Sequence, residues 1–186
     1  MRTRPRPKFN SKYSVRDLIK WFRIAAESRN KLLKAGATDN VGAIHSATRI
    51  LEILGSQLKY KDVGHINNLR HWPYAEFSVK AKAAYRRGQR VLIEHVSPMR
   101  ELTCKAIEKT KYKSDGPLLR LIGTHYRLVL LTPEETTKLN RQNRTKIDPG
   151  RLAGIKMAPV PSRRGLTIVA PRESLRRRIS RPTPTR

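Results

Sequence analysis

Apolar residues at regular spacings are concentrated in the middle of this 186-residue chain, and this confines a folded core to that region. There they recur about every three or four positions, as in amphipathic helices, or run together as in buried strands. Beyond Pro171 the chain is rich in Arg, Pro, Ser and Thr and has too little apolar surface to fold. We therefore predict one domain over residues 12–158, with disordered basic arms at 1–11 and 159–186.

The spacing predicts that the domain begins with a hairpin of two helices. The first follows Ser14 as its N-cap and closes near Gly36, and the second starts at Asp39 or Asn40. The short connection between them favours an antiparallel pair. A third helix is expected over residues 73–87.

Two apolar runs, residues 91–96 and 125–131, read as strands separated by two helices. Two helices between them make the strands antiparallel, whereas a single crossover would make them parallel. A capping box at 132–135 opens a last helix that ends near Asn143. Residues 165–170 are a candidate third strand. The expected fold class is α+β, a helical hairpin followed by a small two- or three-stranded sheet with helices.

Positive charge is in large excess and is unevenly placed. Lys and Arg number 41 against 14 Asp and Glu, a formal charge of +27, of which residues 1–16 carry +6, 136–186 carry +12 and 17–135 carry +9. Such a balance points to a polyanionic partner, most often nucleic acid. We expect binding to DNA or RNA through phosphates with little sequence readout, as in small basic phage, mobile-element and ribosome-associated proteins.

The densest basic run within the predicted domain falls at the end of the third helix. It contains Lys80, Lys82, Arg86, Arg87 and Arg90, and no acid occurs between Glu76 and Glu94. Cations also suit the negative end of a helix dipole, so a purely structural explanation stands beside phosphate binding. Further candidate phosphate-binding residues lie nearer the C-terminal end: Arg141, Arg144, Arg163, Arg164, Arg176, Arg177 and Arg178.

Other features limit the remaining classes of function. No apolar run is long enough to cross a membrane, and the basic N-terminal segment lacks the apolar stretch of a secretory signal. Cys104 is the single cysteine, which excludes a disulfide within one chain. We expect a cytoplasmic location with nucleic acid or a ribonucleoprotein complex. An acidic protein partner is the non-enzymatic alternative, since the same positive surface would fit it.

One group of residues has a catalytic interpretation. Antiparallel strands would place His95 and His125 at the same end of the sheet, next to Glu94. A carboxylate and two imidazoles can bind a divalent metal or transfer a proton. Neighbouring strand residues point to opposite faces, however, so at most one of Glu94 and His95 enters such a site unless the strand bends. The structural alternative pairs Glu94 with an arginine and His95 with a backbone carbonyl.

The run Glu94-His95-Val96-Ser97-Pro98 resembles the opening segment of HNH-type (ββα-metal) nucleases. The resemblance covers five residues and implies that His95 is the general base and Glu94 an acidic residue near the metal. It departs from the family afterwards, because a helix is expected where the second strand should be, and no His follows His125. A nuclease would need Mg²⁺ or Zn²⁺, whereas nucleic-acid binding alone needs no cofactor.

Overall fold

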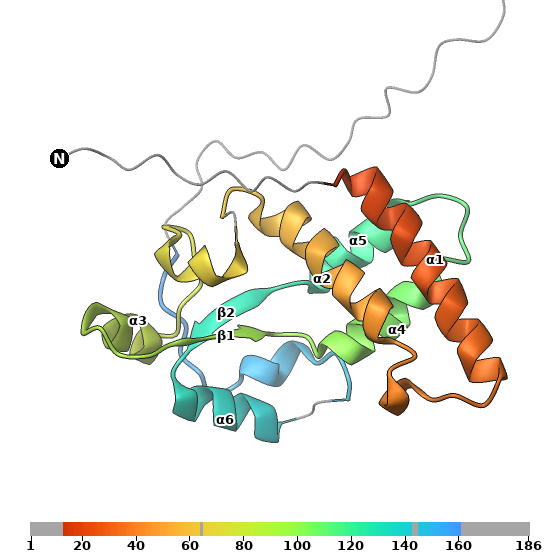
Figure 1. Ribbon diagram of the computed structural model, residues 1–186. Helices are drawn as coiled ribbons and strands as arrows, with labels where there is room; N and C mark the ends of the chain where they lie inside the picture. Colours follow the sequence, from red (N-terminus) through yellow and green to blue (C-terminus); the bar gives the residue numbers. More distant parts are fainter. Residues whose placement is uncertain (1–12, 64, 143–144, 161–186) are drawn as a thin grey trace, which may run out of the picture.

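Two N-terminal helices, α1 (Val15–Lys34) and α2 (His45–Tyr60), pack against each other as a hairpin (Figure 1). They bury the apolar side chains that the spacing indicated, Phe22 and Leu51 among them. The predicted hairpin is confirmed. The computed structural model describes residues 13–63, 65–142 and 145–160.

The second helix begins later than the sequence predicted. Asp39–Val41 form a 3-10 turn, and Gly42 follows it with φ of +102°, a left-handed conformation that suits glycine. Asp39 does not cap an α-helix, and its carboxylate instead accepts a 2.8 Å hydrogen bond from Nε of Arg29. This interaction with Arg29 lowers the pKa of Asp39. Helix α2 starts only at His45, after this turn.

Strands β1 (Leu92–His95) and β2 (Leu128–Leu131) form a two-stranded antiparallel sheet, which confirms the α+β class. The register places Glu94 opposite Val129 and His95 opposite Leu128. Directly opposed side chains in an antiparallel pair lie on the same face of the sheet. The register therefore places Glu94 and Val129 on one face of the sheet and His95 and Leu128 on the other.

Helices α4 (Met99–Lys109) and α5 (Gly116–His125) connect the two strands, as the sequence predicted for an antiparallel pair. The prediction that His125 opens the second strand is wrong. His125 is the last residue of α5, and its neighbour Tyr126 caps the helix through a backbone hydrogen bond to Ile122. Pairing along β2 begins only at Leu128.

The sheet separates two apolar cores of unequal size. Leu128 and Leu130 belong to the larger core, which the helices of the hairpin, α4 and α5 complete. Val129 and Leu131 belong to the smaller core with Leu139 of helix α6 (Pro133–Arg141). Figure 1 shows α6 on the side of the sheet away from α2. Because both faces are covered, every residue of β2 is buried, which explains its uninterrupted apolar sequence.

The third helix is shorter than predicted. Helix α3 is Val79–Arg86, and the chain before it is extended along β2. The amide of Ser78 donates to the carbonyl of Leu130 (3.0 Å), and the amide of Leu130 donates to the carbonyl of Glu76 (2.7 Å). These hydrogen bonds hold residues 76–78 in the extended conformation, so a helix cannot begin at Pro73.

A C-terminal segment adds to the same edge of the sheet. The amide of Ala158 donates to the carbonyl of Phe77, and the amide of Val79 donates to the carbonyl of Lys156, both at 2.8 Å. Residues 156–158 thus lie beside the start of α3. The predicted third strand at 165–170 and nearly all of the two predicted arms lie outside the described residues.

Candidate nucleic-acid interface

Helix α3 and the turn after it carry five basic residues that the sequence singled out. Ser78 is the N-cap, and its Oγ accepts a 2.9 Å hydrogen bond from the amide of Ala81. Ala81 and Ala84 are buried against the core, so the remaining positions of this short helix turn outward. We call the following residues the α3 basic surface: Lys80, Lys82, Arg86, Arg87 and Arg90.

The α3 basic surface is not neutralised by acids of the described chain. Four of its five side chains are exposed and Lys82 is half-buried. None forms an ion pair with a carboxylate among residues 13–63, 65–142 and 145–160. Four arginines elsewhere in the fold do form ion pairs with acids, namely Arg23–Asp115, Arg29–Asp39, Arg49–Glu52 and Arg127–Glu76. Uncompensated, exposed cations on one element are what phosphate binding requires.

Tyr85 has a structural role within this helix. Its hydroxyl lies 2.7 Å from Nδ1 of His71, and its ring packs 5.5 Å from the ring of Phe77, centroid to centroid. These contacts anchor α3 to the loop before it. The hydroxyl and one side of the ring are therefore engaged within the protein.

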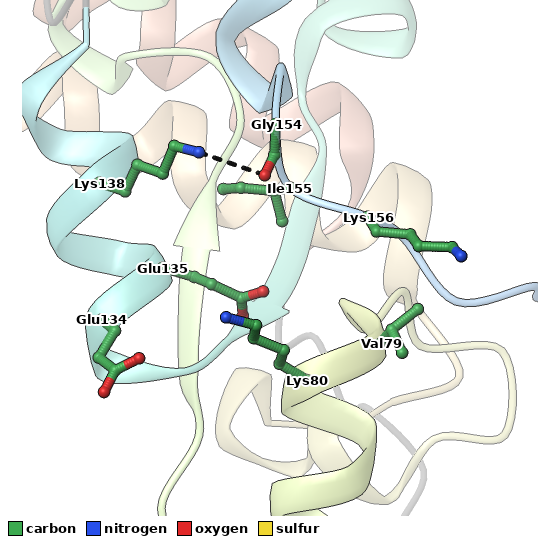
Figure 2. A pocket seen from close by; sticks show the side chains of 8 residues that line it. All are labelled: Val79, Lys80, Glu134, Glu135, Lys138, Gly154, Ile155 and Lys156. Carbon is green, nitrogen blue, oxygen red and sulfur yellow. Dashed lines mark hydrogen bonds between the residues drawn. The ribbon is translucent and has the colours of Figure 1, made fainter.

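A pocket of about 300 Å³ lies beside the first turn of α3 (Figure 2). Its walls come from the first turn of α3, from Glu134, Glu135 and Lys138 of α6 and from residues 154–156. Lys80, Lys138 and Lys156 each contribute a side chain to it. Sequence reasoning missed Lys138 and Lys156, because isolated lysines on separate segments give no local signal.

A buried carboxylate joins the two helix N-termini at the base of this pocket. Glu135 accepts a 2.5 Å hydrogen bond from the hydroxyl of Ser78 and a 3.0 Å hydrogen bond from the amide of Thr132. Thr132 in turn caps α6, since its Oγ1 accepts from the amide of Glu135 (3.2 Å). The capping box of α6 is confirmed, and its link to Ser78 fixes the start of α3 relative to α6.

The structure describes one of the other predicted phosphate-binding residues, Arg141. Arg141 is exposed at the C-terminal end of α6. The remaining predicted residues lie outside the described residues: Arg144, Arg163, Arg164, Arg176, Arg177 and Arg178.

Glu94 and His95 lie on opposite faces of the sheet. Glu94 is opposite Val129, whose side chain enters the smaller core on the α6 side. His95 is opposite Leu128, whose side chain enters the larger core. The strand does not bend in a way that brings the two side chains together, because the ladder continues through both positions.

The imidazole of His95 is packed within the protein. Its ring makes an edge-on contact with Tyr126, with 5.5 Å between ring centroids. Burial lowers the pKa of His95, while Glu52 opposes this shift and Arg151 adds to it. The buried Arg151 donates to the carbonyls of His95 (3.0 Å) and Val96 (2.8 Å). Sequence reasoning did not find this arginine, which comes from a segment more than fifty residues away.

These residues do not assemble the metal centre that the nuclease resemblance implies. His125 ends α5, and partial burial and the nearby Lys105 lower its pKa. Within the described ranges, no three His, Cys, Asp or Glu side chains are grouped so that they could hold a metal ion. We therefore derive no metal-dependent step from Glu94, His95 and His125.

Comparisons with known proteins found no relative of this chain. No protein-family model, no curated protein and no solved structure matches the chain. Among the described helices, none combines the length and the apolar character needed to cross a membrane.

Proposed function

We propose that the protein binds nucleic acid through its phosphates, with the α3 basic surface as the main contact inside the folded domain. The observation that carries the proposal is that four of these five cations are exposed and that none forms an ion pair with an acid among the described residues. Cations at the C-terminal end of a helix also suit its dipole, and without an acidic partner their charge is available to phosphates.

Phosphate contact without sequence readout is the mode that this surface favours. A base-reading element needs side chains projected into a groove as a rigid set, often an Arg or Asn held for a bidentate contact. The arginines of the α3 basic surface lie instead around the end of a two-turn helix and its following turn. Such cations give affinity that depends on salt and little on sequence.

The proposal is tested by titrating labelled single-stranded and duplex DNA and RNA over roughly 50 to 200 mM salt, with affinity read by fluorescence anisotropy. We expect a linear fall of log K with log salt. Replacing Arg86, Arg87 and Arg90 together by Gln should reduce the slope by about 0.7 to 0.9 for each phosphate that the variant no longer binds. Affinity that hardly changes with salt would overturn the proposal.

A matched variant separates a local surface from net charge. Lys34, Lys111 and Lys113 are exposed on α1 and on the α4–α5 loop, away from α3 in Figure 1. Replacing these three by Gln removes the same charge. The α3 triple variant should lose clearly more affinity than this control, and equal losses would remove α3 from the proposed interface.

A further inference from the structure

The pocket between α3 and α6 has the chemistry of a phosphate-binding site. We propose that it receives one backbone phosphate of a bound nucleic-acid strand. This inference rests on the proposed function and adds a defined subsite to it. The pocket shares Lys80 with the α3 basic surface, so a strand that lies along α3 meets the pocket at the first turn of the helix.

The cations of the pocket come from three separate segments, and in Figure 2 the side chain of Lys156 points away from those of Lys80 and Lys138. Lys80 comes from α3, Lys138 from α6 and Lys156 from the C-terminal segment, and all three are exposed. None forms an ion pair with an acid in the part of the chain that the structure describes. Nζ of Lys138 donates to the carbonyl of Gly154 at 3.3 Å. An ammonium group has three donors, so this bond orients Lys138 and leaves two donors for an anion.

Two acids, Glu134 and Glu135, also line the pocket. The carboxylate of Glu135 is buried and turned toward Ser78 and the amide of Thr132. Two helix N-termini therefore offset its charge. Glu134 is exposed at the start of α6, and in Figure 2 its carboxylate points away from Lys138. The three lysines therefore outnumber the two acids that line the pocket.

The volume fits a phosphate and part of its sugar. About 300 Å³ is at the lower end of the range for small-molecule sites and exceeds what one phosphate group needs. Val79 and Ile155 supply apolar surface to the same walls. Apolar contact beside cations suits a sugar–phosphate unit better than an isolated inorganic anion.

The test compares three variants in the full-length protein. Replacing Lys138 and Lys156 together by Gln should weaken oligonucleotide binding, by about fivefold to tenfold at roughly 0.1 M salt for each phosphate that the variant no longer binds. The Lys138→Arg variant should keep near-normal affinity, because the charge remains. The Glu134→Gln variant should bind more tightly, since it removes a negative charge from the rim. Thermal unfolding of each variant checks that the fold persists.

The outcomes separate this inference from the proposed function. If the Lys138 and Lys156 double variant binds as well as the unchanged protein while the triple arginine variant is weakened, the pocket assignment is overturned and the proposed function stands. If neither variant affects binding and salt has no effect, the proposed function itself is overturned.

Inorganic phosphate and a mononucleotide serve as free-ligand probes. Their binding is monitored through the backbone NMR signals of residues 154–156. Weak shifts with the free anions, together with the reduced oligonucleotide affinity of the double variant, support a backbone subsite. Saturable binding of the free anions with no effect of the double variant on oligonucleotide binding would overturn it.

Discussion

Among single residues, Tyr126 shows how closely α2 approaches the end of the sheet. Its ring lies against Gly55 of α2, and its hydroxyl forms a 2.9 Å hydrogen bond with Ser56. A Cβ at position 55 would overlap the Tyr126 ring. Burial, the dominant effect, raises the pKa of the Tyr126 hydroxyl, which therefore stays neutral across the physiological range. Only glycine allows this approach.

We expect the Gly55→Ala variant to lose about 1–3 kcal/mol of unfolding free energy, because the added methyl group forces Tyr126 or α2 to shift. Chemical denaturation measures the loss. Gly123→Ala is the matched control, since it is also within a helix and a Cβ there meets no atom within 4 Å. It should be neutral or gain up to about 1 kcal/mol. Similar effects at both positions would contradict the close contact.

His95 gives the fold a pH dependence near neutrality. Its pKa in the folded protein is lowered, mainly by burial, from the ordinary 6.5. Below about pH 6.5 the unfolded chain therefore binds more protons than the folded protein, so the unfolding free energy falls as the pH decreases. We expect His95→Gln to flatten this fall below about pH 6.5. The lowered pKa of Asp39 acts in a separate window, below about pH 4.

Urea denaturation at a series of pH values checks this expectation. His125→Gln is the control. The pKa of His125 is also lowered, but its imidazole, at the C-terminal end of α5, is less buried than that of His95. Its effect on the slope should be smaller. A stability profile that keeps its slope in His95→Gln would assign the pH dependence to other groups.

Between elements, the contact of Ser78 with Glu135 fixes α3 to α6. We expect Ser78→Ala to cost about 2–3 kcal/mol of unfolding free energy, because it removes the N-cap of α3 and leaves a buried carboxylate with one partner fewer. Ser14→Ala removes an exposed N-cap and should cost about 1 kcal/mol. Denaturant unfolding of both variants compares them, and equal costs would argue against the buried link.

The same element shows why the spacing predicted too long a third helix. Tyr74, Phe77 and Ala81 have a spacing compatible with a helix from Pro73. The backbone of residues 76–78 pairs instead with β2 and with residues 156–158. Those partners are about fifty to eighty residues away, so local spacing carried no sign of them. Tertiary hydrogen bonds overrode the local helical pattern.

For the molecule as a whole, the charge of the ends should add affinity without specificity. Replacing Arg176, Arg177 and Arg178 by Gln is expected to lower the salt slope of binding by about 0.7 to 0.9 for each phosphate that the variant no longer binds. The reduction in affinity should be the same for every nucleic-acid sequence. Competition with unrelated oligonucleotides measures it. A sequence-dependent reduction would contradict purely electrostatic binding.

Local spacing in the chain was enough to predict the helical hairpin, the two strands and the capping box of α6, and composition alone showed the excess of positive charge. These features depend on neighbours a few residues apart, which a single chain displays directly. Strand alternation also predicted that Glu94 and His95 point to opposite faces. The folded arrangement was needed to show which core lies on each face and that Arg151 reaches the end of β1. It also brought three lysines to one pocket. Strand register and packing join distant segments, and because their contacts leave no local pattern, no reading of spacing could have found them.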